Sequence, residues 1–177
     1  MNLGNKKNVN LNYDWHFLTV EYKFFDLRIV IVQVQDIMST NVKTVTPDQL
    51  VKDIAIIMVM DHISGAPVVD SNNNLVGIIS EKDILQHMFP KLDEVMSDTH
   101  FDFENMEHNY KDTMNVKVGE LMTKDVASID LSMPCLKAAS TMWLRNFRRI
   151  PVTHNNKLVG IVSIGDVHRA IFKSRIK

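Results

Sequence analysis

The chain has 177 residues, of which 45% are hydrophobic and 23% are charged, and its formal net charge at pH 7 is −1. This is the composition of an ordinary soluble globular protein with one domain or two small ones. Because the net charge is close to zero, no strong field favours nucleic acid or an anionic membrane surface as a partner.

Membrane insertion and disulfide bonding are also disfavoured by the sequence. The most apolar early stretch, residues 17–34, carries four charged residues: Glu21, Lys23, Asp26 and Arg28. A membrane-spanning helix needs about 20 residues with few charges, so no span is expected. The only cysteine, Cys135, cannot form an intramolecular disulfide. We expect it to be a buried residue of a protein that stays in a reducing compartment, the cytoplasm.

Residues 1–33 do not match the rest of the chain. The first 12 residues are polar and rich in asparagine, whereas residues 17–34 mix aromatic and β-branched side chains, and residues 29–32 favour a strand. Three interpretations stay open for this N-terminal extension: a docking arm, a strand added to a partner, or an extension without a physiological role.

A first structural unit is predicted over residues 34–89. It begins with a short helical turn at residues 36–40 and a short strand at residues 42–45. The tetrapeptide Thr46-Pro47-Asp48-Gln49 then has the features of a helix start: Thr46 as the N-cap, Pro47 at the first helical position and Gln49 closing a capping box.

The helix that follows is apolar on more than one face. One buried face is predicted from the spacing of Leu50, Ile54, Ile57 and Met58. Further apolar residues widen this face: Val51, Ile56, Val59 and Met60. We therefore expect the helix to pack on two sides, against a sheet and against another repeat or subunit.

A hairpin and a second helix complete the unit. Gly65 is expected just past the helix end. Residues 66–70 and 75–79 predict two strands joined by the turn Ser71-Asn72-Asn73-Asn74. Ser80 opens the next helix, which we expect to run through Met88 and stop near Pro90.

Residues 90–117 form an acidic connector. A structureless loop of this length is unusual in a compact domain, and four apolar side chains suggest that the connector packs: Phe101, Phe103, Met106 and Tyr110. A helix is predicted around Phe103 to Asp112.

Residues 118–177 repeat the first unit. At an offset of 84 positions Asp130 falls on Thr46, Met142 on Met58 and Pro151 on Pro67; after a shorter turn the offset is 83 and aligns Gly160, Ser163 and Asp166 with Gly77, Ser80 and Asp83. The chain is thus predicted to be an α+β protein with two β-α-β-β-α repeats. Since each is small, the two repeats are expected to share one core.

This order of elements resembles the CBS domain, the cystathionine-β-synthase-type module that occurs in tandem pairs. The resemblance is carried by the motifs Asp36-Ile37-Met38, Ser64-Gly65-Ala66-Pro67-Val68-Val69-Asp70, Gly77-Ile78-Ile79-Ser80-Glu81-Lys82-Asp83, Val118-Gly119-Glu120-Leu121-Met122-Thr123, Arg149-Ile150-Pro151-Val152 and Gly160-Ile161-Val162-Ser163-Ile164-Gly165-Asp166. It covers about three quarters of the chain, and the connector is similar to that of stand-alone bacterial CBS-pair proteins. The resemblance implies a pseudo-two-fold pair (a Bateman module), two clefts between the repeats that bind adenine nucleotides or other adenosyl ligands, and a homodimer shaped as a flat disc.

The repeated Gly-x-x-Ser-x-x-Asp motif supplies the first candidate site residues. Ser80 and Ser163 lie at predicted helix N-termini, where free backbone N–H groups and the helix dipole attract phosphate. Asp83 and Asp166, one turn further, can accept both ribose hydroxyls, as the acidic residue of dinucleotide-binding folds does. The alternative is a capping box that needs no ligand, and the two roles compete for the aspartate.

Arg148 and Arg149 are candidate phosphate contacts. The resemblance places basic residues of some family members here, and guanidinium groups suit bidentate contacts with phosphate. The first repeat has Ser64-Gly65 instead, so the two clefts are not expected to be equivalent. The alternative is a solvated basic pair on the surface.

The resemblance also implies that each cleft combines the first strand of one repeat with the Ser-x-x-Asp of the other. Thr44 and Thr46 are then candidates for the cleft of Ser163 and Asp166, and Ala127 and Ser128 for the cleft of Ser80 and Asp83. Thr46 also has the competing role of helix N-cap.

The prediction for function is a regulatory module rather than an enzyme. No Cys–His or Ser–His–Asp arrangement is placed to act, and the seven histidines form no metal-ligand spacing. No cofactor is required; the expected regulatory ligand is AMP, ADP, ATP or S-adenosylmethionine, and the expected partners are a second copy of the chain and an unknown protein. The alternatives are a structural or dimerisation module with empty clefts, and an enzyme that acts on nucleotides.

Overall fold

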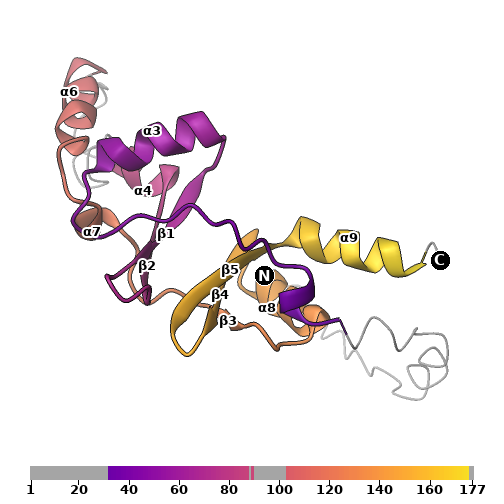
Figure 1. The fold of residues 1–177 in the computed structure, drawn as a ribbon. Coiled ribbons are helices and arrows are strands. Elements are labelled where there is room, and N and C mark those ends of the chain that lie inside the picture. The colour runs from indigo at the N-terminus through magenta and orange to yellow at the C-terminus, as the bar shows by residue number, and fades with distance from the viewer. Residues whose placement is uncertain (1–31, 88, 90–102, 176–177) are drawn as a thin grey trace, which may run out of the picture.

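Two halves of similar construction make up the part of the chain that the computed structural model describes, residues 32–87, 89 and 103–175 (Figure 1). The elements of the first half are α3 (Val51–Asp61), β1 (Gly65–Val69), β2 (Leu75–Ser80), α4 (Glu81–Gln86), α6 (Phe103–Thr113) and α7 (Val118–Leu121). Those of the second are η2 (Val34–Asp36), β3 (Ile129–Asp130), α8 (Cys135–Leu144), β4 (Arg149–His154), β5 (Lys157–Ser163) and α9 (Ile164–Arg175). The predicted α+β class of a tandem repeat is confirmed.

Each half contains an antiparallel hairpin. β1 pairs with β2, β4 pairs with β5, and β3 joins β4 in parallel. Both hairpin turns use asparagines with positive φ, at 64° for Asn73 and at 50° and 64° for Asn155 and Asn156. Asparagine tolerates this left-handed conformation better than most residues, which explains the asparagine-rich turns.

The opening segments of the two repeats are exchanged. Ser39 pairs with Ile161 of β5 through N–H···O=C bonds of 2.9 and 3.0 Å, and Thr123 pairs with Ile78 of β2 through bonds of 2.8 and 3.0 Å. Consequently η2 lies beside α8 and α7 lies in the half of α3 (Figure 1). By sequence these segments open the first and the second repeat, but in space each completes the sheet of the other.

The hydrophobic residues form two clusters instead of the single shared core that we expected. One cluster surrounds Ile54 and Ile79 and includes Val118. The other surrounds Met142 and Ile150 and includes Val34. Because the exchanged segments bring Val118 and Val34 into these clusters, each half has enough apolar side chains for a core of its own.

The predicted start of the first long helix at Thr46 is wrong. Helix α3 begins at Val51, where the Leu50 N–H donates to Asp53 at 3.2 Å. The residues before it pair with the start of the second repeat, since Val51 donates to the Val116 carbonyl and Gly119 donates to the Pro47 carbonyl, both at 2.9 Å. These tertiary hydrogen bonds hold residues 46–50 in a turn that precedes the helix.

Smaller differences have similar causes. Residues 42–45 form a single parallel bridge, from Val45 to Val68, in place of the predicted strand, and the early helical turn is the 3-10 helix η2, two residues before its predicted position. α3 ends with His62 in the left-handed conformation (φ 53°), and Gly65 already belongs to β1. The described part of α4 ends at Gln86, and Met88 and Pro90 lie outside the described residues.

α6 covers the connector segment for which we predicted a helix, and it packs against α4. Residues 1–31, which carry the three open interpretations of the extension, lie outside the described residues. Among the helices of the described ranges, none is both long and apolar enough to cross a membrane.

Candidate functional site

Both Ser-x-x-Asp motifs fold into capping boxes at the junction of a strand and a helix. At the first, the Ser80 N–H and hydroxyl donate to Asp83 Oδ2 at 2.8 and 2.5 Å, and the Asp83 N–H donates to Ser80 Oγ at 3.4 Å. At the second, Ser163 donates to Asp166 Oδ2 at 2.7 and 2.6 Å, and Asp166 returns a bond of 3.2 Å. The capping role that we weighed against ligand binding is therefore present in both repeats.

The second oxygen of each aspartate distinguishes the two sites. Asp83 Oδ1 accepts a long hydrogen bond of 3.4 Å from the hydroxyl of Thr123, which comes from the other repeat. Asp166 Oδ1 accepts an ion-paired hydrogen bond from Arg169, one turn further along α9. The Asp83 carboxylate is thus contacted by a residue of the other repeat, whereas the Asp166 carboxylate is contacted by a residue of its own helix.

These contacts set the ionisation of Asp166. Burial raises the pKa of its carboxyl group, but the hydrogen bonds from Ser163 and the Arg169 guanidinium lower the pKa by more. The net pKa of Asp166 lies below its ordinary value, so the group is an anion at neutral pH.

A cavity of about 200 Å³ lies between the two hairpins. Its lining comes in pairs that the repeat relates, since Ser64 corresponds to Arg148, Gly65 to Arg149, Pro67 to Pro151 and Ile78 to Ile161. The cavity therefore lies on the pseudo-two-fold axis, and only the second repeat supplies charge to it.

Arg149 reaches across this axis. Its Nη1 donates to Ser64 Oγ at 3.3 Å, and the Ser64 carbonyl accepts the N–H of Glu81, the first residue of α4, at 3.1 Å. In its own repeat Arg149 is paired in register with Ser163. The arginine thus connects the two Ser-x-x-Asp junctions.

The four remaining candidates do not gather with these residues. The Thr46 N–H donates to the Gln49 side chain at 2.7 Å in a turn, and the Ser128 hydroxyl lies 3.1 Å from that of Thr153. Thr44 and Ala127 are half-buried. Of the ten candidates, only Arg148 and Arg149 are among the described residues that line the central cavity. The assignment of all the others to the clefts, Ser80, Asp83, Ser163 and Asp166 included, stays a prediction.

Sequence reasoning missed three features of the site. The first is the close packing of Met38 and Met122 on the glycines of the other repeat's motif; the others are the Thr123 contact and the Arg169 contact. The glycine contact had a signal, because the same methionine and the same glycine recur in both repeats. The Arg169 contact had none, since its counterpart in the first repeat is Gln86. Thr123 has a hydroxyl counterpart in Ser39, but nothing in the sequence indicated that its hydroxyl contacts Asp83.

Within the described ranges, no three His, Cys, Asp or Glu side chains come together in a group that could hold a metal ion. His100, one of two connector histidines, lies outside those ranges.

The comparisons with known proteins agree with this arrangement of paired repeats. The family model of the CBS domain matches residues 34–89 and again residues 118–173. The chain belongs to the CBS domain family, and its fold is that of a tandem CBS pair.

Its relatives differ in length and in what is known of them. An uncharacterized protein of Methanocaldococcus jannaschii is 31% identical over 155 residues, which are 80% of this chain and 92% of the relative. The chloroplastic CBS domain-containing protein CBSX2 of Arabidopsis thaliana is 31% identical over 143 residues, 73% of this chain but 58% of the relative. This chain therefore spans little more than half of CBSX2.

Solved structures show the same fold. The crystal structure of CBSX2 in complex with AMP has a TM-score of 0.63 at 30% identity and covers 81% of this chain and 98% of that chain. The CBS domain of a membrane protein from Sphaerobacter thermophilus has a TM-score of 0.66 at 28% identity and covers 88% of this chain and 97% of that chain.

Proposed function

We propose that this chain is a regulatory module that binds an adenine nucleotide between its two CBS repeats and passes a conformational change to a partner protein. The observation that carries the proposal is the position of Arg149, which lies on the pseudo-two-fold axis and connects the two Ser-x-x-Asp junctions. A cation at this point suits the phosphate of a ligand whose ribose meets one of the aspartates.

The AMP complex of CBSX2 supports an adenosyl ligand. Within this chain, Arg148 and Arg149 favour AMP, ADP or ATP over S-adenosylmethionine, because the latter has no phosphate for a guanidinium to bind. In this proposal the ligand is a regulatory effector, and the protein requires no cofactor. The cytoplasmic location expected from the single cysteine stays a prediction.

The size of the cavity suggests how binding would be transmitted. Pockets for small molecules usually measure about 300–1,000 Å³, whereas the central cavity holds about 200 Å³. We therefore propose that the two hairpins move apart as a nucleotide binds. Since the ligand prefers the opened arrangement, it shifts the population toward that state, and a partner that recognises this state responds.

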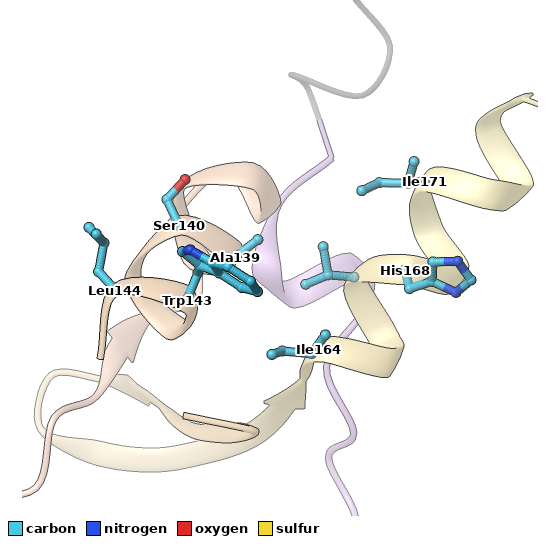
Figure 2. A pocket seen from close by; sticks show the side chains of 8 residues that line it. Ala139, Ser140, Trp143, Leu144, Ile164, His168 and Ile171 are labelled. Atoms are coloured by element: carbon cyan, nitrogen blue, oxygen red, sulfur yellow. The ribbon is translucent and has the colours of Figure 1, made fainter. Parts of the chain in front are cut away.

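A second copy of the chain is the first partner that we propose. Helix α3 exposes Ile56, Val59 and Met60, and on α8 the side chains of Trp143 and Leu144 are 82% and 83% exposed. In the second repeat these residues border an apolar groove of about 580 Å³ between α8 and α9, where Trp143 and Ala139 face Ile164 and Ile171 (Figure 2). Apolar surface of this extent is typical of an interface, so we propose a homodimer through the helical faces.

The experiment that tests ligand binding is thermal unfolding with AMP, ADP, ATP or S-adenosylmethionine, each at about 1 mM. A ligand at 100 times its dissociation constant stabilises the fold by about 2.7 kcal/mol, a shift of several degrees. We expect AMP, ADP or ATP to raise the melting temperature and Arg149→Ala to abolish the shift. Arg145→Ala is the matched control, because Arg145 caps α8 and does not line the cavity.

Two other results would change the proposal. A shift with S-adenosylmethionine alone would contradict the phosphate role of Arg149. The absence of a shift with every ligand, on a folded sample, would favour the alternative of a structural or dimerisation module with empty clefts.

A further inference from the structure

The N-terminal turn of α9 is covered by a side chain of its own helix. The guanidinium of Arg169 pairs with Asp166 Oδ1, and its Nη1 lies 3.4 Å from the place where a Cβ on Gly165 would stand. The guanidinium thus lies beside Gly165, in the first turn of α9. The Asp166 side chain is only 14% exposed, whereas that of Arg169 is 64% exposed.

The first repeat is built differently at the same positions. Gln86 corresponds to Arg169 and Lys82 corresponds to Gly165. Asp83 consequently has no ion pair within the described part of α4, and its second oxygen accepts a hydrogen bond from Thr123 of the other repeat, at 3.4 Å. The ion pair between Arg169 and Asp166 is therefore specific to the second repeat and is not a general feature of the repeated fold.

This arrangement decides what a ligand must do at Asp166. Ser163 already uses Oδ2, and Arg169 uses Oδ1. Ribose hydroxyls that donate to this carboxylate therefore compete with the guanidinium for Oδ1 and favour its displacement. An unphosphorylated adenosyl ligand leaves the displaced cation without an anion, whereas a phosphate offers it a new one at the positive end of the α9 dipole.

We propose that Arg169 makes the second cleft selective for phosphorylated adenosyl ligands over unphosphorylated ones, by exchanging Asp166 for the ligand phosphate as its partner. The inference rests on the proposed function, because it assumes that an adenosyl ligand binds in this cleft. It assigns a specificity-determining role to a residue outside the Gly-x-x-Ser-x-x-Asp motif.

The test is calorimetric titration of the full chain with AMP and with adenosine. The variant is Arg169→Gln, which installs the residue of the first repeat. Lys173→Gln is the matched control, because it removes the same charge from an exposed position one turn further along α9. Arg169 is largely exposed, so its replacement leaves the core untouched.

We expect Arg169→Gln to strengthen adenosine binding about two- to fivefold, since the competing exposed ion pair is a weak one. It should weaken AMP binding about tenfold, the usual effect of losing one charge-assisted hydrogen bond. The preference for AMP therefore falls, while Lys173→Gln leaves both affinities close to those of the wild type.

Two outcomes would overturn the proposal, and they can be told apart. If AMP and adenosine bind but Arg169→Gln changes neither affinity, or changes both in the same direction, the selective role of Arg169 is wrong and the proposed function stands. If neither ligand binds the wild type or the variant, the proposed function itself fails.

Discussion

The sulfur of Met38 lies 2.7 Å from the position that a Cβ atom on Gly160 would occupy. The equivalent pair in the other half is Met122 and Gly77, at 2.5 Å. In each pair the methionine follows the opening of one repeat and the glycine belongs to the sheet of the other. These contacts give the repeated glycine a packing role, independent of any ligand.

Gly160→Ala is expected to destabilise the fold. The new methyl group would overlap with Met38 and approach the Ser39 carbonyl oxygen, at 3.0 Å, which belongs to a paired backbone and cannot move easily. Overpacking of this kind costs about 1–3 kcal/mol, which thermal or urea unfolding measures.

Gly165→Ala is the matched control for this prediction. A Cβ there meets its neighbours at 3.4 and 3.5 Å, ordinary contact distances, so it should be neutral or slightly stabilising. In the background of Gly160→Ala, Met38→Ala should recover part of the loss. Equal stability of Gly160→Ala and the wild type would contradict the packing role.

Acid is expected to weaken the second capping box. Because the pKa of Asp166 is lower in the folded chain than its ordinary value, the carboxylate stabilises the fold above the unfolded pKa of about 3.9. This stabilisation is lost as the pH falls through the lower, folded pKa.

Asp166→Asn should therefore lower the stability at pH 7 by about 1 kcal/mol and should flatten the loss of stability between about pH 5 and pH 2. Denaturant titrations at a series of pH values measure both effects. Asp125→Asn, at an exposed position with positive φ that asparagine tolerates, is the control. An unchanged pH profile in Asp166→Asn would show that the capping box contributes nothing.

Cys135 is expected to resist alkylation in the native state. Its side chain is fully buried in the second half, and burial raises the pKa of its thiol. Since the thiolate is the reactive form, labelling by iodoacetamide should be at least about 100-fold slower than in denaturant. Lys137→Cys in a Cys135→Ala background is the exposed control, and fast labelling of the native wild type would contradict the burial.

Trp143→Arg is expected to dissociate the proposed homodimer. An arginine at this position would bring a charge into the apolar contact between copies, while its exposure in the single chain leaves the fold unaffected. Light scattering over a concentration series measures the change, and Lys137→Ala, on an exposed position of the same helix, is the control. A monomeric wild type, or a variant that dimerises equally well, would contradict the interface.

Much of the fold could be predicted because the same pattern of elements occurs twice in the sequence. The hairpins, the Ser-x-x-Asp junctions and the helix α6 depend on local signals such as asparagine turns, strand-forming runs and capping residues. The same signals failed at Thr46, whose helix-start pattern is complete. There the backbone pairs with residues 114–119, and no local pattern reveals a partner that far along the chain.

The candidate site was predictable only in part, for a related reason. The motif located Ser80, Asp83, Ser163 and Asp166, but it could not say which atoms surround each carboxylate. Those neighbours are Thr123, which arrives from the other repeat, and Arg169, whose charge could equally have pointed into solvent. Contacts of this kind depend on tertiary placement and on side-chain rotamers.

The exchanged opening segments bear on how such a chain arises. In a polypeptide with one repeat, the opening segment would have no strand of another repeat to pair with. The edge of the hairpin that this segment pairs with would be left without a hydrogen-bonding partner. Two identical copies could satisfy each other, in the way that Ser39 and Thr123 do at Ile161 and Ile78. Duplication within one gene turns that encounter into an intramolecular one, at an effective concentration of about millimolar, and then leaves each copy free to acquire its own residues, as Arg169 and Gln86 show.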